Sequence, residues 1–453
     1  MTTANFLAGA AKVNITPPLG TRINGDFITH FANYIHDDLF ARALVLRSGE
    51  TTVAFVVIDT CIIPKEFADQ TRKLIEAATG IPFQQILLSS THTHAAGSLA
   101  DVHLGSIDVD YTRALPDKIL AAVKSALEAL QPATIGHAAT NAPEHVVCRR
   151  YRLKDGKGYP NPVTGLQDVV KTNPAGMEQW IDQRVAVPDT ELSFLAVRSL
   201  TGEWISILAN YSLHYVGDWA NGTISADYFG VFASHLEKHL GGEMVAMMSN
   251  GTSGDVNIWD FLEPDRYPTE YFAKSKVIGE DLANKILAVV NTVQWEENPA
   301  LSAAYEDVAL TLDRPTADQL LAAEKVVSNT DYEQIAPDTP EQIRALYARE
   351  QLLLNQFPET ISCPVQALRI GNIVVGALGG EFFAETGLCL KAEFESVRYF
   401  TITMANGNIG YVPPADQMAL GGYETWRCRY RSTTDVSESK VREALSQKIS
   451  GLL

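Results

Sequence analysis

The chain has 453 residues, of which 46% are hydrophobic and 20% are charged, an ordinary composition for a globular protein that buries a sizeable core. Its formal net charge of -18 repels phosphate backbones and anionic membrane surfaces, so we expect no nucleic-acid partner. The charge itself indicates a well-solvated acidic surface.

The cysteines and the hydrophobic segments indicate in which cell compartment the protein is expected. The cysteines are scattered, odd in number and never spaced as C-x-x-C, which favours a reducing compartment over a disulfide framework. No run of about 18 apolar residues occurs, so we expect no stable membrane insertion. The N-terminal segment lacks a basic stretch followed by a long apolar run, so we expect no signal peptide and a cytoplasmic protein.

Short apolar strands alternate with amphipathic helices along the first 250 residues. Residues 52–59 form a β-branched apolar run typical of a buried strand, and residues 65–79 show a helical period that ends at Gly80. The other elements predicted here are strands over 85–90, 191–199, 204–210 and 243–249, and helices over 113–130 and 228–240.

The same alternation continues to the C-terminus. The predicted elements are strands over 300–312, 364–370, 372–378 and 398–404, and helices over 316–327, 340–356, 383–395 and 437–451. This order favours an α/β architecture in which helices cover the sheets. We expect a single domain over residues 1–453, with the helices near 314–358 as an elaboration of that domain.

The sharpest local motif is the histidine pair in Ser90-Thr91-His92-Thr93-His94, which follows the predicted strand 85–90. Side chains two apart on extended backbone point to the same face, so both imidazoles are expected to project together from the strand's carboxyl end. Sites of open α/β sheets form at that end, and paired imidazoles suit a metal ion. The alternative is that both histidines simply hydrogen-bond the backbone at the start of a loop.

His214 stands at the end of another apolar strand, and two acidic residues follow it. Asp227 opens the predicted helix 228–240, where we expect it to be the N-cap. Asp255 lies in the glycine-rich loop 250–257, which has neither the lysine of a phosphate loop nor the spacing of a serine-hydrolase elbow. It is expected either to orient a metal-bound histidine or to bond loop amides.

The C-terminal third adds further ionisable groups behind glycines. Glu381 follows two glycines at the end of a predicted strand, either as a metal ligand or as a carboxylate at a helix N-terminus. Tyr411 and Tyr423 stand in glycine-containing turns, where a tyrosine more often packs than reacts.

A basic cluster of Arg149, Arg150 and Arg152 lies in a loop without helical pattern. In so acidic a protein, such a cluster suits a substrate carboxylate or an oxyanion. The alternative is ion pairing with surface acids.

A series of short segments runs in order across nearly the whole chain. The segments are 8–17 (AGAAKVNITP), 35–43 (IHDDLFARA), Asp59, 91–94 (THTH), 210–214 (NYSLH), 225–230 (SADYFG), 254–256 (GDV), 380–381 (GE), 410–412 (GYV) and 423–424 (YE). Taken together they resemble the catalytic domain of the neutral ceramidases, a family of zinc amidases. The resemblance implies a layered sandwich of mixed β-sheets covered by helices.

The resemblance also implies a zinc site. In the family, zinc is held by the first histidine of the pair, a later histidine after a strand, a glutamate and a tyrosine. The matching positions here are His92, His214, Glu381 and Tyr411.

Four further residues are implied to act in catalysis. His94 matches the histidine that sits beside the zinc and assists the reaction. Tyr423 matches a site tyrosine, and a family arginine corresponds to Arg149 or Arg150.

Two departures from the family concern the nucleophile and the substrate. The family motif Gly-Asp-Val-Ser-Pro reads GDVNI over 254–258, and Asn257 replaces the serine, which favours metal-activated water as the nucleophile. The family's C-terminal immunoglobulin-like domain has no counterpart after the catalytic region, so we expect a small soluble acyl substrate in place of ceramide.

The sequence therefore predicts a zinc-dependent hydrolase of an amide or related acyl bond. Ester or lactone substrates remain possible, because metal-bound hydroxide attacks their acyl carbon in the same way. Manganese or iron also remain possible, because a mixed set of nitrogen and oxygen ligands discriminates weakly between metals. One alternative is an amidohydrolase-type metal enzyme on an eightfold barrel, although His235 and His239 fall inside a helical pattern. The other is a non-catalytic ceramidase-like binding protein. The oligomeric state is not predicted.

Overall fold

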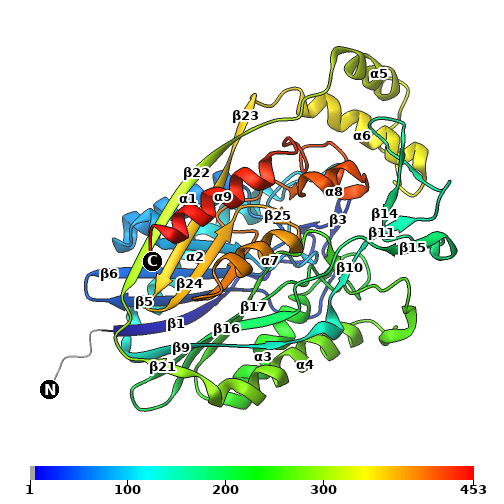
Figure 1. The fold of residues 1–453 in the computed structure, drawn as a ribbon. Helices are drawn as coiled ribbons and strands as arrows, with labels where there is room; N and C mark the ends of the chain where they lie inside the picture. The colour runs from blue at the N-terminus through cyan, green and yellow to red at the C-terminus, as the bar shows by residue number, and fades with distance from the viewer. Residues whose placement is uncertain (1–5) are drawn as a thin grey trace.

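The computed structural model describes residues 6–453, so residues 1–5 of the predicted domain and of the N-terminal segment lie outside it. The described chain forms four layers, in the order helices, larger sheet, smaller sheet, helices (Figure 1). This confirms the predicted α/β class and the layered sandwich of mixed sheets covered by helices.

The larger sheet has nine strands and is antiparallel through its middle. Its strands, in spatial order, are β19 (Val245–Asn250), β17 (Trp204–Tyr211), β16 (Glu191–Ser199), β9 (Gln131–Asn141), β1 (Phe6–Asn14), β5 (Phe40–Ser48), β6 (Thr51–Ile58) and β7 (Ile86–Ser90), with β21 (Gln294–Glu296) paired to β9. Only the outer pairs β17–β19 and β6–β7 are parallel. The larger sheet is therefore mixed, with a parallel pair at each edge.

The smaller sheet has four strands and packs face to face on the larger one. Its strands, in spatial order, are β22 (Leu301–Thr311), β23 (Thr360–Ile370), β24 (Ile373–Leu378) and β26 (Arg398–Ile402). In β24, Ile373 and Val375 face the larger sheet, whereas Val374 and Leu378 face the helices. This two-residue period lets one strand bury both of its faces.

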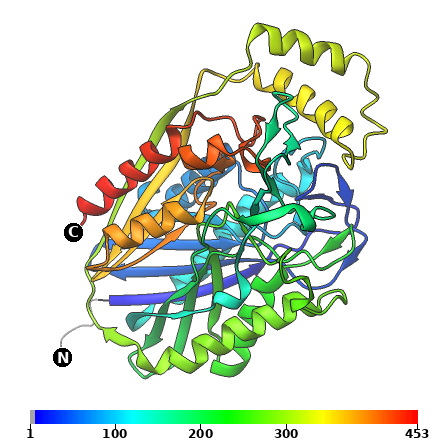
Figure 2. The same cartoon turned by 45° about the vertical axis from the view of Figure 1, so that its right-hand side comes forward.

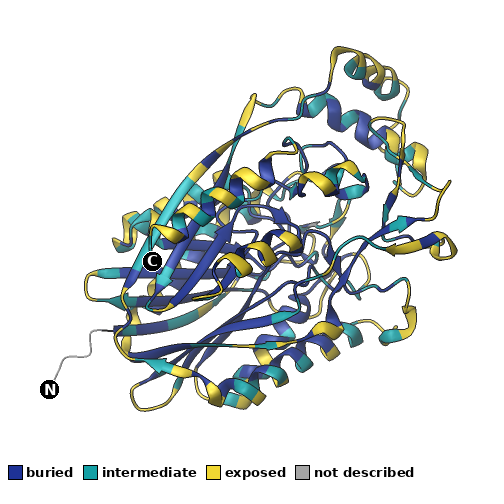
Figure 3. Ribbon diagram, in the orientation of Figure 1, coloured by how far each residue is buried: buried dark blue, intermediate teal, exposed yellow. Residues whose placement is uncertain are grey.

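Helices cover both outer faces of the sandwich, and Figure 3 shows their inner sides buried and their outer sides exposed. The helices against the larger sheet are α1 (Lys65–Thr79), α2 (Val109–Glu128), α3 (Asp227–Leu240) and α4 (Ala273–Val289). The helices against the smaller sheet are α7 (Ala384–Glu393) and α9 (Ser437–Ser450). No helix within residues 6–453 is long and apolar enough to cross a bilayer.

The predicted elaboration near 314–358 corresponds to α5 (Ala317–Val327) and α6 (Pro340–Leu354), which project beyond the layers at one end (Figures 1 and 2). The buried Glu350 of α6 anchors this pair by accepting hydrogen bonds from Arg429 at 2.8 and 2.9 Å. The helices are thereby fixed to the loops beside β27 (Tyr411–Val412). The single-domain assignment itself stays a prediction.

Two predicted details of the helices are wrong. The helix predicted over 113–130 begins at Val109, because the Asp108 carboxylate accepts a hydrogen bond from the Tyr111 amide and caps it. Asp227 is not the N-cap of α3; its carboxylate accepts hydrogen bonds from the amides of Val216 and Tyr228. Asp227 therefore holds the loop after β17, which carries His214.

The eightfold barrel of the amidohydrolase alternative is not formed by residues 6–453, whose main strands build two packed sheets. His235 and His239 lie on α3, as the helical pattern indicated, with ring centroids 4.1 Å apart. The His235 ring also bonds Asn284 of α4. Neither histidine is near the strand ends that carry the histidine pair, so the fold excludes this alternative.

The contact between the two sheets should dominate stability. Leu368 of β23 is fully buried between them, so Leu368→Ala should lower the free energy of unfolding by about 2–5 kcal/mol through lost burial and a cavity. The measurement is urea denaturation followed by circular dichroism. Leu321→Ala on α5 is the control, because that side chain is 65% exposed and the change should stay within about 0.5 kcal/mol. Equal effects of both variants would contradict the two-sheet core.

Candidate metal centre and its cavity

The two edges of the larger sheet come together beneath the site. The segment 403–406, which follows β26, hydrogen-bonds both edges. The Thr403 amide donates to Asn250 at the end of β19, at 2.9 Å. The Met404 carbonyl accepts from the Ser90 amide at the end of β7, at 3.2 Å. The loops after β7, β17 and β24 therefore converge, although their sequences lie far apart.

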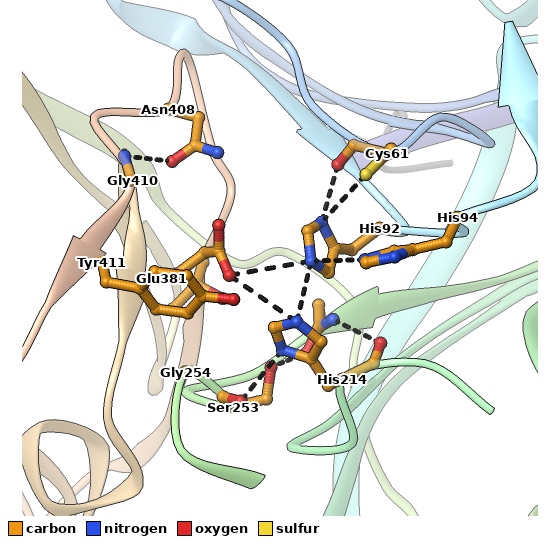
Figure 4. Close-up of polar contacts among 12 residues, drawn as sticks. Cys61, His92, His94, His214, Ser253, Gly254, Glu381, Asn408, Gly410 and Tyr411 are labelled. Atoms are coloured by element: carbon orange, nitrogen blue, oxygen red, sulfur yellow. Dashed lines mark hydrogen bonds and ion pairs between the residues drawn. The ribbon is translucent and has the colours of Figure 1, made fainter. Parts of the chain in front are cut away.

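His92 and His214 face each other across the site, and backbone carbonyls set their tautomers. His92 Nδ1 lies 2.8 Å from the Cys61 carbonyl oxygen and His214 Nδ1 lies 3.1 Å from the Ser253 carbonyl oxygen (Figure 4). A carbonyl oxygen only accepts, so each Nδ1 carries the proton and each Nε2 of a neutral ring keeps its lone pair. The two Nε2 atoms nevertheless lie only 3.0 Å apart. Two acceptors at this distance repel each other, so the arrangement suits a cation between them.

Glu381 completes the set. Its Oε2 lies 3.7 Å from His92 Nε2 and 3.6 Å from His214 Nε2, is buried, and accepts no hydrogen bond from residues 6–453. Ligand atoms at about 2.0–2.1 Å from a tetrahedral zinc lie about 3.4 Å apart. The observed separations of 3.0 to 3.7 Å bracket that value, so these three side chains fit a metal ion.

The loop that carries Ser253 approaches Glu381 closely because residue 254 is glycine. A Cβ at Gly254 would lie 2.5 Å from the Glu381 carbonyl oxygen. The Gly254 amide instead donates to the Phe382 carbonyl at 2.8 Å. This contact joins the loop after β19 to β25 (Glu381–Phe382), and it explains the glycine-rich sequence over 250–257.

The histidine pair does not have the extended geometry predicted for it. His92 has φ of 71°, a left-handed conformation that is uncommon for a residue with a side chain, and it follows the end of β7. His94 nevertheless returns to the site, with its Nε2 3.2 Å from His92 Nε2. The two rings meet edge to face, at 89°. A turn, and not strand alternation, brings them together.

Burial favours the neutral form of all three histidines. Burial lowers the pKa of His92, against the opposing effect of Glu381. Burial also lowers the pKa of His94 and of His214 well below the usual value, and the guanidinium of Arg149 lowers both further. A neutral imidazole is the form that binds a metal.

Tyr411 stands beside Glu381 because β25 and β27 pair in parallel, with these two residues as partners. Its ring extends past the carboxylate toward the histidines and lies nearly parallel to His214, at 11° (Figure 4). Its hydroxyl accepts a hydrogen bond from Arg149 Nη2 at 3.1 Å. Burial, followed by Glu381, raises the pKa of Tyr411 well above the usual value. The structure thus places the predicted tyrosine at the edge of the centre.

The structure separates the two candidate arginines. Arg149 lines the cavity and donates to Glu424 Oε1 at 2.7 Å and to the Gly254 carbonyl at 2.7 Å. Arg150 does not line it; its buried guanidinium donates to Glu424 Oε2 at 2.9 Å and to the Gly421 carbonyl at 2.8 Å. The structure thus places Arg150 outside the cavity lining, where it supports the loop that carries Tyr423, and leaves Arg149 as the arginine at the cavity. Arg152, third in the cluster, does not line the cavity either.

A cavity of about 330 Å³ opens onto the centre. Its lining includes the predicted residues His92, His94, Arg149, His214, Glu381, Tyr411 and Tyr423. Apolar and aromatic side chains form much of the remaining wall, among them Phe27, Trp426 and, from α6, Ile343, and Asp26 and Lys171 add charged groups to it. Tyr423 contacts both Phe27 and Trp426 at ring-centroid distances of 6.0 Å. The volume lies at the small end of the range for ligand sites.

Asp255 and Asn257 lie behind the centre. The Asp255 carboxylate accepts a hydrogen bond from the Ala384 amide at the start of α7, at 2.8 Å, and no histidine contacts it. The carboxylate therefore orients no histidine among the described residues, and the amide that it binds belongs to α7 and not to its own loop. Burial raises the pKa of Asp255 to about 6. The Asn257 amide donates to the side chain of Asn173.

Sequence reasoning missed three residues that shape the site. Tyr215 stacks on His94 with ring centroids 3.7 Å apart and planes at 10°. The carbonyls of Cys61 and Ser253 orient the two facing histidines. Tyr215 follows His214 directly and so had a signal in the sequence, whereas a backbone carbonyl carries none.

Comparison with known proteins gives a structural match only. No family model matches the sequence, and no curated protein matches it. A ceramidase in complex with C2 matches with a TM-score of 0.71 and 15% identity, over 99% of this chain and 75% of that chain. The neutral ceramidase from Pseudomonas aeruginosa matches with a TM-score of 0.72 and 16% identity, over 99% of this chain and 74% of that chain. The fold is ceramidase-like.

The ceramidase-like fold confirms the resemblance read from the ordered segments, because the match extends over 99% of the chain. At identities of 15% and 16%, the match establishes architecture. The roles of individual residues must therefore be argued from the geometry of this chain.

Glu424 should be essential to the structure beside the centre. It is buried and accepts hydrogen bonds from Arg149, Arg150 and Thr172, and although burial raises its pKa, the two arginines outweigh burial and hold the pKa below its usual value. Glu424→Gln leaves both guanidinium charges uncompensated, so it should lower the free energy of unfolding by about 3 kcal/mol or more.

Chemical denaturation at pH 7 measures this loss. The control is Glu128→Gln at the exposed end of α2, which should change the unfolding free energy by less than about 0.5 kcal/mol. An unchanged stability of Glu424→Gln would show that the two arginines do not depend on this carboxylate.

Proposed function

We propose that the protein is a zinc-dependent hydrolase that cleaves an amide or a related acyl bond of a small substrate. The observation that carries the proposal is the pair of buried, neutral Nε2 atoms 3.0 Å apart, with the unpartnered carboxylate oxygen of Glu381 beside them. The ceramidase-like fold supports amide hydrolysis as the reaction class. The cavity of about 330 Å³ supports a small substrate.

His92, His214 and Glu381 would hold the metal, and Tyr411 would be the fourth ligand, because it is the strand partner of Glu381 and its ring extends toward the histidines (Figure 4). Two imidazoles, a carboxylate and a phenol suit zinc, although such a set also accepts manganese or iron. Zinc supplies Lewis-acid chemistry and makes water a nucleophile near neutral pH.

An alternative set of Cys61, His92 and His94 is also close enough for a metal. The Cys61 sulfur, however, lies 3.8 Å from His92 Nδ1, the nitrogen that already donates to the Cys61 carbonyl. His94 contacts the opposite nitrogen of the same ring. The set with Glu381 is therefore favoured, because all three of its ligand atoms face one point.

The remaining polar groups of the cavity have separate tasks. Hydrolysis joins the water oxygen to the acyl carbon, breaks the carbon–nitrogen bond and delivers a water proton to the departing amine. His94 stands at the cavity beside His92, where it can hold that proton and pass it to the nitrogen. Arg149 and Tyr423 line the same cavity and would stabilise the negative charge that develops on the acyl oxygen.

The metal site is tested first by removing one ligand. His92→Ala should remove the bound zinc, expected at about one per chain in the parent protein, and should reduce amide turnover at least about 100-fold. Elemental analysis and a panel of N-acyl substrates measure the two effects. His235→Ala is the matched control, because that histidine lies on α3 and should leave zinc and turnover unchanged. Turnover retained by a zinc-free His92→Ala protein would contradict the proposal.

Metal removal provides a second test, which also separates the enzyme from a binding protein. Dialysis against a chelator should abolish turnover, and about one equivalent of zinc should restore it. A protein that binds zinc stoichiometrically yet hydrolyses no amide, ester or lactone would instead support the non-catalytic alternative.

A further inference from the structure

Lys171 is a cation in the cavity that the proposed reaction does not use. It belongs to β14 (Val170–Thr172), which pairs with β11 (Arg150–Leu153), and it lines the same cavity as the metal centre. The side chain is only partly accessible. Burial lowers the pKa of Lys171, against the opposing effect of Glu424, so its ammonium has lost part of its hydration.

No carboxylate within residues 6–453 forms an ion pair with Lys171. Its ammonium lies 4.2 Å from the centroid of the Tyr159 ring. Tyr159 stacks in turn on Trp426, with centroids 6.0 Å apart and planes at 14°. Trp426 also lines the cavity, so the lysine is held at an aromatic wall of the cavity without an acidic partner.

The other charged groups of the cavity are already engaged. Arg149 binds Glu424, Gly254 and Tyr411. Asp26 binds the His30 ring at 2.8 Å, and Glu381 faces the histidines. Among the charged side chains of the described lining, Lys171 is thus the one whose N–H donors are available to an anion.

We propose that Lys171 binds a carboxylate on the substrate, so that the compound hydrolysed is an N-acyl amino acid or a similar acyl amide bearing one carboxylate. This inference rests on the proposed function and specifies its substrate class. One ammonium matches a single negative charge, whereas a phosphate group would call for several donors or an arginine fork. In a protein of net charge -18, a local cation is also what allows an anion to bind at all.

The apolar lining accounts for the rest of such a molecule. Phe27, Ile343 and Trp426 offer a dry surface for a short acyl chain. The acyl carbon would then lie at the metal centre and the carboxylate at Lys171. The small volume of the cavity favours a chain of a few carbons over a long lipid chain.

The test compares two amides that differ in charge. N-hexanoylglycine carries a carboxylate, and N-hexanoylethanolamine is a neutral amide of similar size. The parent protein should prefer the acid in kcat/KM, and Lys171→Met should reduce that preference at least about tenfold, mainly through KM for the acid. Lys171→Arg keeps the charge and should retain part of the preference.

Lys157→Met is the matched control. Lys157 also lies over an aromatic ring, 4.8 Å from the centroid of Trp180, but it is exposed and does not line the cavity. Its loss should leave the preference unchanged. Equal preference for both amides in the parent protein, or identical behaviour of Lys171→Met and Lys157→Met, would overturn the inference while leaving the proposed function intact.

Direct binding separates the two proposals. Calorimetry with metal-depleted protein measures N-hexanoylglycine affinity independently of turnover. Binding to the parent protein that weakens at least about tenfold in Lys171→Met would support the carboxylate site even if neither amide were hydrolysed. Absence of both binding and turnover of the acid would overturn the inference.

Discussion

The site depends on the close approach of two imidazole nitrogens that each carry a lone pair. His92 Nε2 and His214 Nε2 lie 3.0 Å apart, and neither can donate to the other because the carbonyls of Cys61 and Ser253 fix the protons on the opposite nitrogens. Acceptors do not share a buried site without a cation. The tautomers thus leave both Nε2 lone pairs free to bind a metal ion, and the unpartnered oxygen of Glu381 would supply the matching negative charge.

Much of the surrounding structure keeps this arrangement in place. His92 adopts a left-handed backbone conformation, which costs about 1–3 kcal/mol and persists only where its surroundings enforce it. The His92 amide donates to the Thr60 carbonyl at 2.9 Å, which fixes the turn. Asp227 bonds the loop of His214, and Gly254 lets the loop of Ser253 reach Glu381. The bond to Thr60 thus holds the strained backbone of His92, while separate contacts fix the loops of His214 and Ser253.

The fold was predictable where hydrophobic residues recur with the clear period of a strand or a helix. The β-branched run of β6 and the pairing of β16 with β17 follow directly from the sequence. Strands β1 and β9 escaped prediction because small and polar residues interrupt their apolar pattern, and each becomes a strand through its neighbours in the sheet. The order of the segments predicted side chains that, apart from Arg150, line one cavity. It could not distinguish Arg149 from Arg150, since only their opposite directions in the folded loop separate them.

By itself, the sequence determined the α/β class, the positions of most strands and helices, and the residue types available for a metal: two histidines after strands, a glutamate behind glycines and a tyrosine in a turn. The tertiary structure decided which nitrogen of each imidazole is free, how closely the two histidines and Glu381 approach, and which lysine lines the cavity. These properties depend on contacts between residues more than a hundred positions apart, such as His92 and His214. Local periodicity carries no information about such contacts, because they arise only when the strand ends are brought together by packing of the two sheets.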